Sequence, residues 1–436
     1  MGGWSERLEQ RIASREARPA VVGLGYVGLP LLVELAQAGF RTIGVDIDAE
    51  RVRQLREGRS YVQDVPDAAV AAGVRDGRME VGTDFDLLRD ADSIDICVPT
   101  PLRKTRDPDV SYIVAAVDGV IPRFGPGKLV ILESTTYPGT TEELLLPRLA
   151  APGLQVGEDF FLAFSPERVD PGNARYTTKN IPKVVGGVTP TCTRLAAQLF
   201  ACAVERVVPV SSTRVAEMVK LLENTFRSVN IGLVNELALL SDRMGIDVWE
   251  VIDAASTKPF GFMPFYPGPG LGGHCIPIDP FYLSWKARES GFEARFIELA
   301  GHVNASMPAH VVGKVQRVLN DERKALRSAR VLLIGIAYKA EIDDLRESPA
   351  LDVWKLLEEQ GAVVAYHDPY APACRRGDGR VASRPLDAVT LREADVVVIT
   401  TAHRKLDYEL ILREAHRIVD TRNAFRGRSD PKITRI

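Results

Sequence analysis

One cysteine of this sequence stands in a setting that suits covalent chemistry. Cys275 follows Gly272, Gly273 and His274 in the segment FGFMPFYPGPGLGGHCIPIDP, where Gly and Pro are the commonest residues. Such a loop exposes backbone N–H groups that suit a phosphate, and regular secondary structure does not account for its composition. Most lone cysteines are inert core residues, but packing one thiol does not require so many loop-forming neighbours. We therefore expect Cys275 to act as a nucleophile and His274 to support the loop by a hydrogen bond.

Two polar residues interrupt an apolar helical segment. Lys220 and Asn224 are four positions apart, so they project from one face of the predicted helix. A lysine and an amide that are directed into a pocket stabilise an oxyanion or move a proton. The alternative is that both residues form the solvated side of an apolar helix, and the spacing supports the two interpretations equally.

A glycine-rich turn near the N-terminus matches the dinucleotide-binding fingerprint. Gly23, Gly25 and Gly28 follow a predicted strand and open a predicted helix, and Asp46 ends the next strand 18 residues after Gly28. These glycines allow a tight turn and let a pyrophosphate approach the backbone at the helix N-terminus. A carboxylate at Asp46 accepts from ribose hydroxyls and repels a 2′-phosphate, so the fingerprint predicts NAD. Arg51 lies close by and would tolerate NADP.

A strand–turn–helix pattern at both ends of the chain would position these residues. Residues 19–45 predict a strand, a helix and a second strand, and the same pattern returns from residue 329. SIDICVP and KLVILEST are typical of buried strands in a parallel sheet, and FLAFSPE and KVVGG continue the alternation. We expect an α/β protein with two Rossmann-like doubly wound domains, joined by a long central helix and a helical middle domain. The expected parts are an N-terminal extension over residues 1–18, a Rossmann domain over 19–210, a central helical domain over 211–325 and a C-terminal α/β domain over 326–436.

The segment over residues 211–245 predicts one long helix. It has no Pro, and its apolar residues recur at helical spacing over a wide face. Such a helix would be about 45 Å long, more than one small domain covers. We expect it to link two domains and to pair with its counterpart in a second subunit, which predicts a homodimer or a larger homo-oligomer.

Composition excludes several classes of function. The formal net charge is −3, from 55 Lys plus Arg and 58 Asp plus Glu, and this is not the charge of a nucleic-acid-binding protein. No apolar stretch approaches the roughly 20 residues of a membrane span, and the first residues lack the apolar core of a signal peptide. The five cysteines form no CxxC pair and no Cys/His metal spacing. We expect a cytoplasmic protein with no metal and with neither nucleic acid nor membrane as a partner.

From Ala20 to about Arg428 the sequence resembles the UDP-glucose/GDP-mannose dehydrogenase family. Seven motifs in the family's order carry this resemblance: GLGYVGLP, CVPTPL, ESTTYPGTTEE, FSPERVDPGN, EMVKLLENTFR, GPGLGGHCIPIDPFYL and AYKAEIDDLRESPA. CVPTPL, SPERVDPGN and GGHCIPIDP most resemble the branch that oxidises UDP-N-acetylhexosamines, with UDP-N-acetylglucosamine as the favoured substrate. UDP-GalNAc, UDP-ManNAc and UDP-glucose stay open as alternatives.

The resemblance implies an oxidation of the sugar C6 alcohol to a carboxylate, with two molecules of NAD used in succession. Cys275 would attack the C6 aldehyde to give a thiohemiacetal, which is oxidised to a thioester and then hydrolysed. Lys220 and Asn224 match the pair that stabilises the developing oxyanion. Asp279 matches the carboxylate that works with this lysine on proton transfer and water.

Two further residues match positions that are linked to a catalytic water, Thr135 and Glu167. The resemblance implies that Glu167 activates the water in thioester hydrolysis, alone because Pro171 stands where the UDP-glucose branch has a second acidic residue. Ile278 replaces a lysine of that branch, and Arg168 lies beside the sugar-binding stretch. These departures agree with the N-acetyl sugar branch.

The resemblance also implies two sets of binding residues. The C-terminal domain is expected to hold the nucleotide half of the substrate, and Lys258 is expected to reach the sugar carboxylate of a neighbouring subunit. Cofactor contacts are expected from Gly23, Gly25, Tyr26, Val27, Gly28, Asp46, Arg51, Thr100, Pro101, Thr135 and Arg346. Substrate contacts are expected from Glu167, Arg168, Val169, Lys220, Lys258, Phe265, Tyr266, Gly268, Gly272, Tyr338, Lys339 and Arg422.

Two other functions compete with this one. A two-electron hydroxyacid dehydrogenase shares the glycine turn and a Lys-x-x-x-Asn helix, but it lacks a nucleophilic cysteine and a second nucleotide-sized domain. An NAD-responsive scaffold without activity would keep the fold, although every matched catalytic position is filled by the expected residue type. The product expected from the resemblance, a uronate of the UDP-sugar, would supply a surface polysaccharide or another glycoside.

Overall fold

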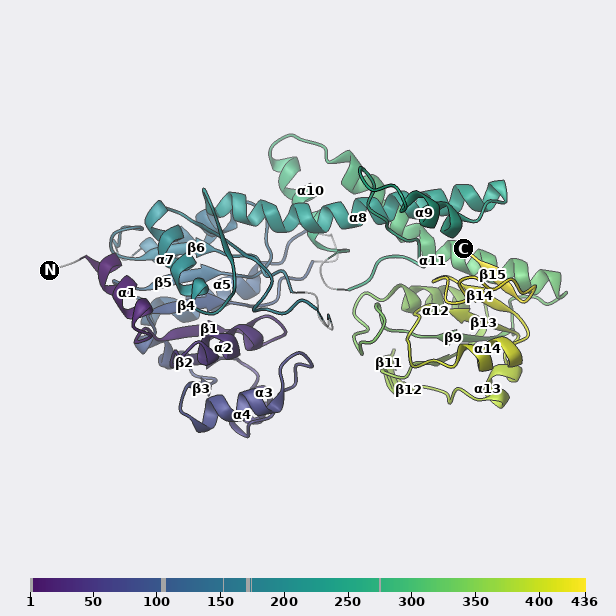
Figure 1. Cartoon of the computed structure of the whole chain (residues 1–436), viewed down its shortest axis with the longest axis horizontal. Coiled ribbons are helices and arrows are strands. Elements are labelled where there is room, and N and C mark those ends of the chain that lie inside the picture. The colour runs from purple at the N-terminus through teal and green to yellow at the C-terminus, as the bar shows by residue number, and fades with distance from the viewer. Residues whose placement is uncertain (1–2, 103–106, 152, 170–172, 174, 274–275) are drawn as a thin grey trace. The chain divides into compact units, whose positions relative to one another are not determined.

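The structure of the chain is a computed structural model that describes residues 3–102, 107–151, 153–169, 173, 175–273 and 276–436. The chain divides into two compact units. The N-terminal unit comprises Met1–Glu223 and Trp285–Phe292, and the C-terminal unit comprises Asn224–Ser284 and Glu293–Ile436. Figure 1 labels many of the helices and strands of the two units.

The N-terminal unit contains an eight-stranded sheet in the order β3-β2-β1-β4-β5-β6-β7-β8. Its neighbouring strands are parallel, except that β7 runs antiparallel to β6. A parallel return needs a helical crossover, and no helix occurs in the described part of the connection between Phe164 and Lys183. The strand direction therefore reverses between β6 and β7, and β8 runs parallel to β7. The strands are β1 (Pro19–Val22), β2 (Thr42–Val45), β3 (Met79–Gly82), β4 (Ser93–Ile96), β5 (Leu129–Leu132), β6 (Phe161–Phe164), β7 (Lys183–Gly187) and β8 (Val207–Val210).

Helices cover this sheet on both faces, because its central strands are apolar at almost every position. Val21 of β1 belongs to one buried cluster, while its neighbours Ala20 and Val22 belong to the other. Side chains alternate between the faces of a strand, so each cluster marks one face of the sheet. The helices are α1 (Trp4–Ala13), α2 (Gly28–Gln37), α3 (Ala49–Arg56), α4 (Asp67–Arg75), α5 (Ser111–Val120), α6 (Leu146–Ala150) and α7 (Pro190–Ala201), with short turns η1 (Phe85–Asp90), η2 (Ile121–Arg123) and η3 (Thr141–Leu145).

The N-terminal residues are part of this unit. Leu8 and Ile12 of α1 are buried in the same cluster as Leu195 and Leu199 of α7. The carbonyl of Glu9 accepts a hydrogen bond from Gln198 Nε2 at 3.2 Å. The α1 helix therefore packs as an additional layer on the sheet.

The long helix that the sequence predicts is α8 (Thr213–Met244), of 32 residues. At 1.5 Å per residue it is about 48 Å long. The two units meet in the sequence within this helix, after Glu223, and again within α10 (Asp279–Glu289), after Ser284. Both helices thus contribute residues to each unit.

The C-terminal unit contains a five-stranded parallel sheet in the order β10-β9-β13-β14-β15 (Figure 1). Buried Trp249 of α9 donates through Nε1 to the carbonyl of Ile436 at 3.1 Å, so the end of the chain is held by the helical part of the unit. The strands are β9 (Arg330–Ile334), β10 (Val363–His367), β13 (Val396–Ile399), β14 (Ile418–Asp420) and β15 (Ile433–Arg435), with a hairpin of β11 (Ala373–Arg376) and β12 (Gly379–Ala382). The helices are α9 (Val248–Ala255), α11 (Arg295–Asp321), α12 (Pro349–Glu359), α13 (Ala388–Glu393) and α14 (Tyr408–Glu414).

The predicted fold class is confirmed, with a Rossmann-like sheet at each end of the chain and helices in the middle. Within the described ranges, none of the helices combines the length and the apolar composition that a membrane span requires.

Candidate active site

The glycine turn lies between β1 and α2 and presents backbone to its surroundings. A Cβ atom on Gly28 would lie 1.9 Å from the carbonyl oxygen of Gly23, so no larger residue fits there. A Cβ atom on Gly25 would meet nothing within 4 Å, so the main chain of Gly25 is open to a bound group. Val27 precedes α2 and provides no side-chain cap for its first turn. The turn therefore fits the pyrophosphate of a dinucleotide.

Asp46 fixes this turn from the end of β2. Its Oδ2 accepts from the backbone N–H of Leu24 at 2.8 Å, and its Oδ1 accepts from that of Asp48 at 2.9 Å. Arg51 forms an ion pair with Asp46 at 3.6 Å and lies 5.5 Å over the ring of Tyr61. A carboxylate has about four acceptor positions, so Asp46 retains capacity for a ribose hydroxyl. These residues fit NAD.

Two further cofactor candidates, Thr100 and Thr135, follow the neighbouring strands β4 and β5. The carboxyl ends of parallel strands meet at one edge of a sheet, where ligands of this fold bind. Ser134 joins the two segments, because its Oγ accepts from the N–H of Val98 at 2.9 Å and donates to the carbonyl of Val98 at 2.8 Å. Thr100 is buried and Thr135 is half-buried. Pro101 lies beside Thr100 in the loop after β4 and is half-buried. Tyr26 lies in the glycine turn between β1 and α2 and is 45% exposed.

Glu167 lies in the loop after β6 and is held at three points. Its Oε1 accepts from the N–H groups of Arg168 and Val169, each at 2.7 Å. Its Oε2 is 3.6 Å from Nζ of Lys183. Its carbonyl oxygen accepts from Nζ of Lys220 at 2.6 Å. Glu167 and Lys220, which the sequence analysis places in the catalytic set, are thus in direct contact.

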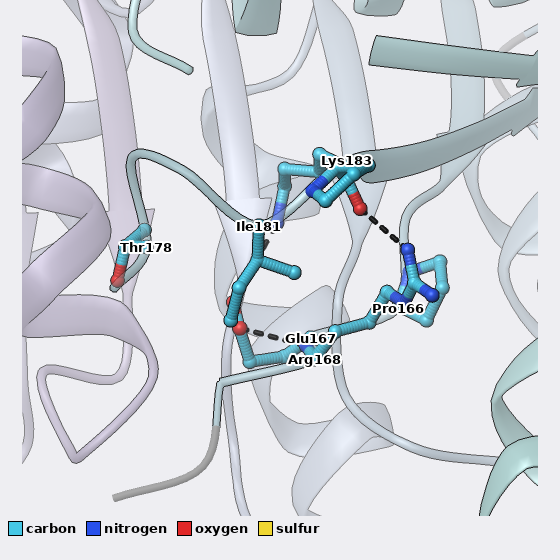
Figure 2. A pocket seen from close by; sticks show the side chains of 7 residues that line it. Pro166, Glu167, Arg168, Thr178, Ile181 and Lys183 are labelled. Carbon is cyan, nitrogen blue, oxygen red and sulfur yellow. Dashed lines mark hydrogen bonds and ion pairs between the residues drawn. The ribbon is translucent and has the colours of Figure 1, made fainter. Parts of the chain in front are cut away.

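Residues of this loop line a small pocket (Figure 2). Arg168 points away from Glu167, and its Nη1 donates to the carbonyl of Pro182 at 2.6 Å. Its Nη2 donates to Glu223 at 2.6 Å, so the guanidinium is paired within the chain. The pocket is lined by Pro166, Glu167, Arg168, Thr178, Ile181, Pro182 and Lys183.

A buried group of charged side chains next to this loop was missed by the sequence analysis. Lys183 forms an ion pair with Glu133 at 3.0 Å, and both side chains are almost fully buried. Burial raises the pKa of the Glu133 carboxyl, although Lys183 opposes the shift, and the pKa reaches about 7. Burial and the nearby charge of Glu133 hold the pKa of Asp95 well above its usual range. The available signal was a charge inside or directly beside an apolar strand, in SIDICV, VILEST and PKVVGG.

In the C-terminal unit, Asn224 and Asp279, two residues of the predicted catalytic set, are in contact with each other. Asn224 Nδ2 donates to Asp279 Oδ2 at 2.5 Å, and both residues are buried. A buried amide–carboxylate pair of this kind orients the carboxylate. Cys275 and His274 lie outside the described residues.

The glycine-rich loop that contains Gly268 and Gly272 packs against substrate-binding candidates of the same unit. A Cβ atom on Gly268 would lie 2.6 Å from Nη1 of Arg422, and one on Gly272 would lie 2.6 Å from Cβ of Tyr338. Arg422 donates through Nε to the carbonyl of Thr400 at 2.9 Å. Burial lowers the pKa of Arg422 to about 10. The two glycines therefore let this guanidinium and this tyrosine approach the main chain of the loop.

Two buried amides that the sequence analysis missed hold this loop in place. Asn235 of α8 accepts from the N–H of Gly268 at 3.0 Å and donates to Oδ1 of Asn304 on α11 at 2.8 Å. Asn304 in turn donates to the carbonyl of Ser228 at 3.1 Å. Each amide is buried and hydrogen-bonded, so the pair fixes the loop relative to two helices. The sequence of α8 holds three Asn residues and that of α11 holds two, so no sequence signal distinguishes these two buried amides.

The remaining candidates occupy the surface of the C-terminal unit or loops near the glycine segment. Tyr266 stacks on Trp249 at 5.9 Å between ring centroids and donates to Asp253 at 2.9 Å. Lys258 is exposed, with Nζ over the ring of Phe260. Phe265 and Lys339 are half-buried, and Arg346 pairs with Asp344.

Within the described part of the chain, no group of three or more His, Cys, Asp or Glu residues is arranged to hold a metal ion. Among those residues Cys97, Cys192 and Cys374 are buried free thiols, and Cys202 is half-buried.

The fold and these residues define a class of dinucleotide-dependent oxidoreductases, and the chain belongs to the UDP-glucose/GDP-mannose dehydrogenase family. The family's NAD binding domain matches residues 17–204, its central domain residues 214–306 and its UDP binding domain residues 332–427. The chain is therefore an NAD-dependent nucleotide-sugar dehydrogenase, which confirms the predictions of NAD and of oxidoreductase activity.

Individual relatives differ in the sugar that their names carry. The chain is 39% identical over 364 residues to a UDP-N-acetyl-D-glucosamine 6-dehydrogenase of Pseudomonas aeruginosa, covering 82% of this chain and 84% of that one. It is 36% identical to an NDP-N-acetyl-D-galactosaminuronic acid dehydrogenase of Ralstonia nicotianae, covering 92% and 95%. The solved structure of a UDP-D-ManNAc dehydrogenase of Pyrococcus horikoshii has a TM-score of 0.88 and 33% identity, covering 96% and 99%. These relatives define the class of reaction, and their names cover three different N-acetylhexosamines.

Proposed function

We propose that the chain oxidises the C6 alcohol of a UDP-N-acetylhexosamine to the uronate, with UDP-N-acetylglucosamine as the favoured substrate. The observation that carries the reaction is the buried hydrogen bond between Asn224 and Asp279 at 2.5 Å. In the sequence, Asp279 comes four residues after Cys275 of the glycine loop. The 39% identity to a UDP-N-acetyl-D-glucosamine 6-dehydrogenase supports the choice of sugar.

In this proposal Cys275 keeps the sugar attached to the protein between two oxidations. Its thiolate adds to the C6 aldehyde to form a thiohemiacetal, oxidation gives a thioester, and water releases the uronate. NAD, when bound at the glycine turn, supplies the hydride acceptor for each oxidation. An alcohol-to-acid oxidation needs a covalent carrier, or a hydrated aldehyde, between its two hydride steps, and Cys275 is the residue proposed to supply the carrier.

The polar residues take roles that agree with their contacts. Asn224 and Lys220 stabilise the oxyanion that develops on the sugar oxygen, and Asp279 moves the proton. Thr135 and Glu167 are assigned to the hydrolytic water. The backbone N–H groups that Glu167 Oε1 accepts from hold this carboxylate in one orientation.

The nucleotide half of the substrate is assigned to the C-terminal unit. Arg422 is a half-buried cation whose Nη1 faces the loop at Gly268, which suits a diphosphate.

We assign domains at the boundaries expected from the sequence: 1–18, 19–210, 211–325 and 326–436. The full set of proposed substrate contacts is Glu167, Arg168, Val169, Lys220, Lys258, Phe265, Tyr266, Gly268, Gly272, Tyr338, Lys339 and Arg422.

A homodimer through α8 also belongs to this proposal, as does localisation in the cytoplasm. Leu233, Leu237, Leu240 and Met244 recur at helical spacing along α8 and are 40–61% exposed in the single chain. An apolar stripe of this kind suits a second copy of the helix.

The test is the amount of NADH formed for each UDP-N-acetylglucosamine consumed by the purified protein with excess NAD. A ratio of about two supports the covalent route. A ratio of about one would show release of the aldehyde and would contradict the thioester step. Cys275→Ser should stop formation of the acid, whereas Cys202→Ser, at a half-buried thiol, should leave it unchanged.

The choice of sugar is tested in the same assay. UDP-GlcNAc, UDP-GalNAc, UDP-ManNAc and UDP-glucose are compared by kcat/KM, and we expect UDP-GlcNAc to lead. Faster turnover of another of these sugars would keep the reaction and change the substrate. Full activity of Cys275→Ser on a hydroxyacid would support the two-electron dehydrogenase, and NAD binding without turnover of any sugar would support a scaffold.

A further inference from the structure

A buried cation in the N-terminal unit has no role in the reaction as proposed above. Lys183 is the first residue of β7, and its side chain is 6% exposed. It lies between two carboxylates, with Nζ 3.0 Å from Glu133 Oε2 and 3.6 Å from Glu167 Oε2. Its ammonium group also lies 4.8 Å over the ring of Phe200 on α7. Placing an ammonium group here is costly unless the carboxylates pair with it, so the arrangement is specific.

Charge on Lys183 is maintained by these neighbours. Burial alone would lower the pKa of Lys183, but Glu133 and Glu167 outweigh it, and the pKa is raised. Asp95 on β4 also faces this group, since it pairs in register with Ile131, two residues before Glu133, and side chains two apart share a face. The two carboxylates therefore favour the charged form of Lys183.

The second observation is the position of Glu167 between two lysines. Its carboxylate is held by Lys183 and by two backbone N–H groups, while its carbonyl accepts from Lys220 at 2.6 Å. Lys220 is 8% exposed, so this carbonyl is a large part of what orients its ammonium group. A change in the Glu167 side chain would rotate the residue and move the carbonyl with it.

We propose that Lys183, with Glu133 behind it, is a positioning residue that acts through Glu167 and so orients the ammonium group of Lys220. The inference rests on the proposed function only for the role of Lys220 in oxidising the sugar. In this arrangement Lys183 holds the carboxylate, the carboxylate holds the loop of residues 167–169, and the loop carbonyl holds Lys220. In this proposal Lys183 acts through Glu167 and not by direct contact with the substrate or the cofactor.

The proposal is tested by a double-mutant cycle in kcat. Lys183→Met keeps the length of the side chain and removes its charge, and we expect kcat to fall about 100-fold, as small misplacements of catalytic groups do. The KM for NAD should change less than about threefold, because the residues assigned to NAD stay in place. The KM for the UDP-sugar should rise, because residues 167–169 and Lys220 are among its proposed contacts. Lys183→Arg should restore most of kcat. Lys179→Met, at an exposed lysine four residues earlier, is the matched control and should behave as wild type.

The decisive comparison uses Glu167→Gln. If Lys183 acts through Glu167, Lys183→Met should reduce kcat by less than about threefold further in the Glu167→Gln background. Losses that multiply in the double variant would overturn the proposal, as would a folded Lys183→Met protein with wild-type kcat. If Lys183→Met does not fold, the isosteric Glu133→Gln takes its place, with a smaller expected loss and the same requirement of non-additivity.

A readout without substrate separates this inference from the proposed function. Acetylation of Lys220 by an N-hydroxysuccinimide ester is followed by peptide mass spectrometry. We expect Lys220 to react several-fold faster in Lys183→Met than in wild type or in Lys179→Met, because its carbonyl partner is displaced. An unchanged rate contradicts the inference alone, whereas a faster rate in a protein that turns over no UDP-sugar contradicts the proposed function alone.

Discussion

The first turn of each Rossmann-like unit is built on the same plan. After β1, Gly23 has φ +91°, and a Cβ atom there would lie 2.5 Å from the carbonyl of Cys97 at the end of β4. After β9, Gly335 has φ +78°, and a Cβ atom there would lie 2.3 Å from the carbonyl of Thr401, after β13. In both units only glycine allows the chain to leave the first strand so close to its neighbour.

A carboxylate at the end of the second strand then fastens each turn. Asp46 accepts from the N–H of Leu24 at 2.8 Å, and Asp368 accepts from those of Ile336 and Ala337 at 2.7 and 3.1 Å. The two carboxylates therefore occupy equivalent places, one strand over from the turn that they hold.

The units differ in the length of chain between this turn and the next helix. Residues 23–27 separate β1 from α2, so the helix N-terminus and the open main chain of Gly25 lie directly at the turn. Residues 335–348 separate β9 from α12, and this loop carries Tyr338, Lys339 and Arg346. We therefore predict that this scaffold recognises its ligand by backbone where the loop is short and by side chains where the loop is long.

The long loop also needs its own support. His403 is fully buried, accepts from the N–H of Glu341 at Nδ1 (3.0 Å) and donates from Nε2 to Asp368 (3.2 Å). Glu341 has φ +68°, a conformation that costs free energy for a residue other than glycine. The Asp368–His403 pair holds this strained residue, and Asp46 has no such task.

The largest expected effect comes from closing the short turn. Gly28→Ala puts a Cβ atom 1.9 Å from the carbonyl of Gly23, so α2 must move away from the turn. We expect NAD to bind at least about 100-fold more weakly, while UDP binding, assigned to the other unit, keeps its affinity. Isothermal titration of both ligands measures this.

The matched control is Gly25→Ala, whose added Cβ meets nothing within 4 Å of the protein. It should unfold at the wild-type Tm and still weaken NAD about tenfold, because the new methyl group occupies space for the pyrophosphate. Wild-type affinity for NAD in this variant would show that the short turn does not recognise its ligand by open backbone.

The next effect concerns the support of the long loop. Burial would raise the pKa of Asp368, but the hydrogen bonds from His403 and from backbone N–H groups outweigh it and lower the pKa from 3.8 to about 2. A lowered carboxyl pKa stabilises the fold above the unfolded-state value, and this contribution is lost as pH falls from about 4 to 2. The contribution is about 2 kcal/mol.

Asp368→Asn should therefore lower the free energy of unfolding by about 3 kcal/mol at pH 7, since it also leaves buried N–H groups and His403 without a full acceptor. Below about pH 4 the deficit should shrink. Denaturant unfolding at pH 7, 4 and 3 measures it, and a deficit that is equal at all three values would show that the lowered pKa is not its source.

Much of this architecture follows from the sequence, and the reasons are local. The glycine fingerprint, the apolar strands and the long helix 213–244 each leave a pattern within a short window, so their positions are predictable. The equivalence of Asp46 and Asp368 was not predicted, because it depends on which strands are neighbours. Lys183 and Glu133 were missed for the same reason: they are 50 residues apart in the chain and meet only across the sheet.

The smallest expected effect concerns Glu133, a buried carboxylate of the N-terminal unit, which we compare with Asp368 of the C-terminal unit. Glu133 has Lys183 as its ion-pair partner, and its Oε1 has no hydrogen bond in the described structure, whereas Asp368 accepts from several N–H groups. Burial accordingly raises the pKa of Glu133 from 4.5 to about 7, against the opposing effect of Lys183. A raised carboxyl pKa means that the folded protein binds the proton more tightly than the unfolded chain. Stability from this source is present at low pH and is lost as pH rises from about 4.5 to 7.

The free energy of unfolding of Glu133→Gln should therefore rise relative to that of wild type as pH rises from 5 to 8. The gain is at most about 2 kcal/mol, because the new amide leaves Lys183 with one carboxylate fewer. Thermal unfolding of both proteins over this range gives the difference in Tm. In Asp368→Asn the same difference should stay constant between pH 5 and 8, since the pKa of Asp368 lies far below. A slope in Glu133→Gln together with a constant difference in Asp368→Asn would confirm that hydrogen-bond donors distinguish the two carboxylates, and equal slopes in both variants would remove that distinction.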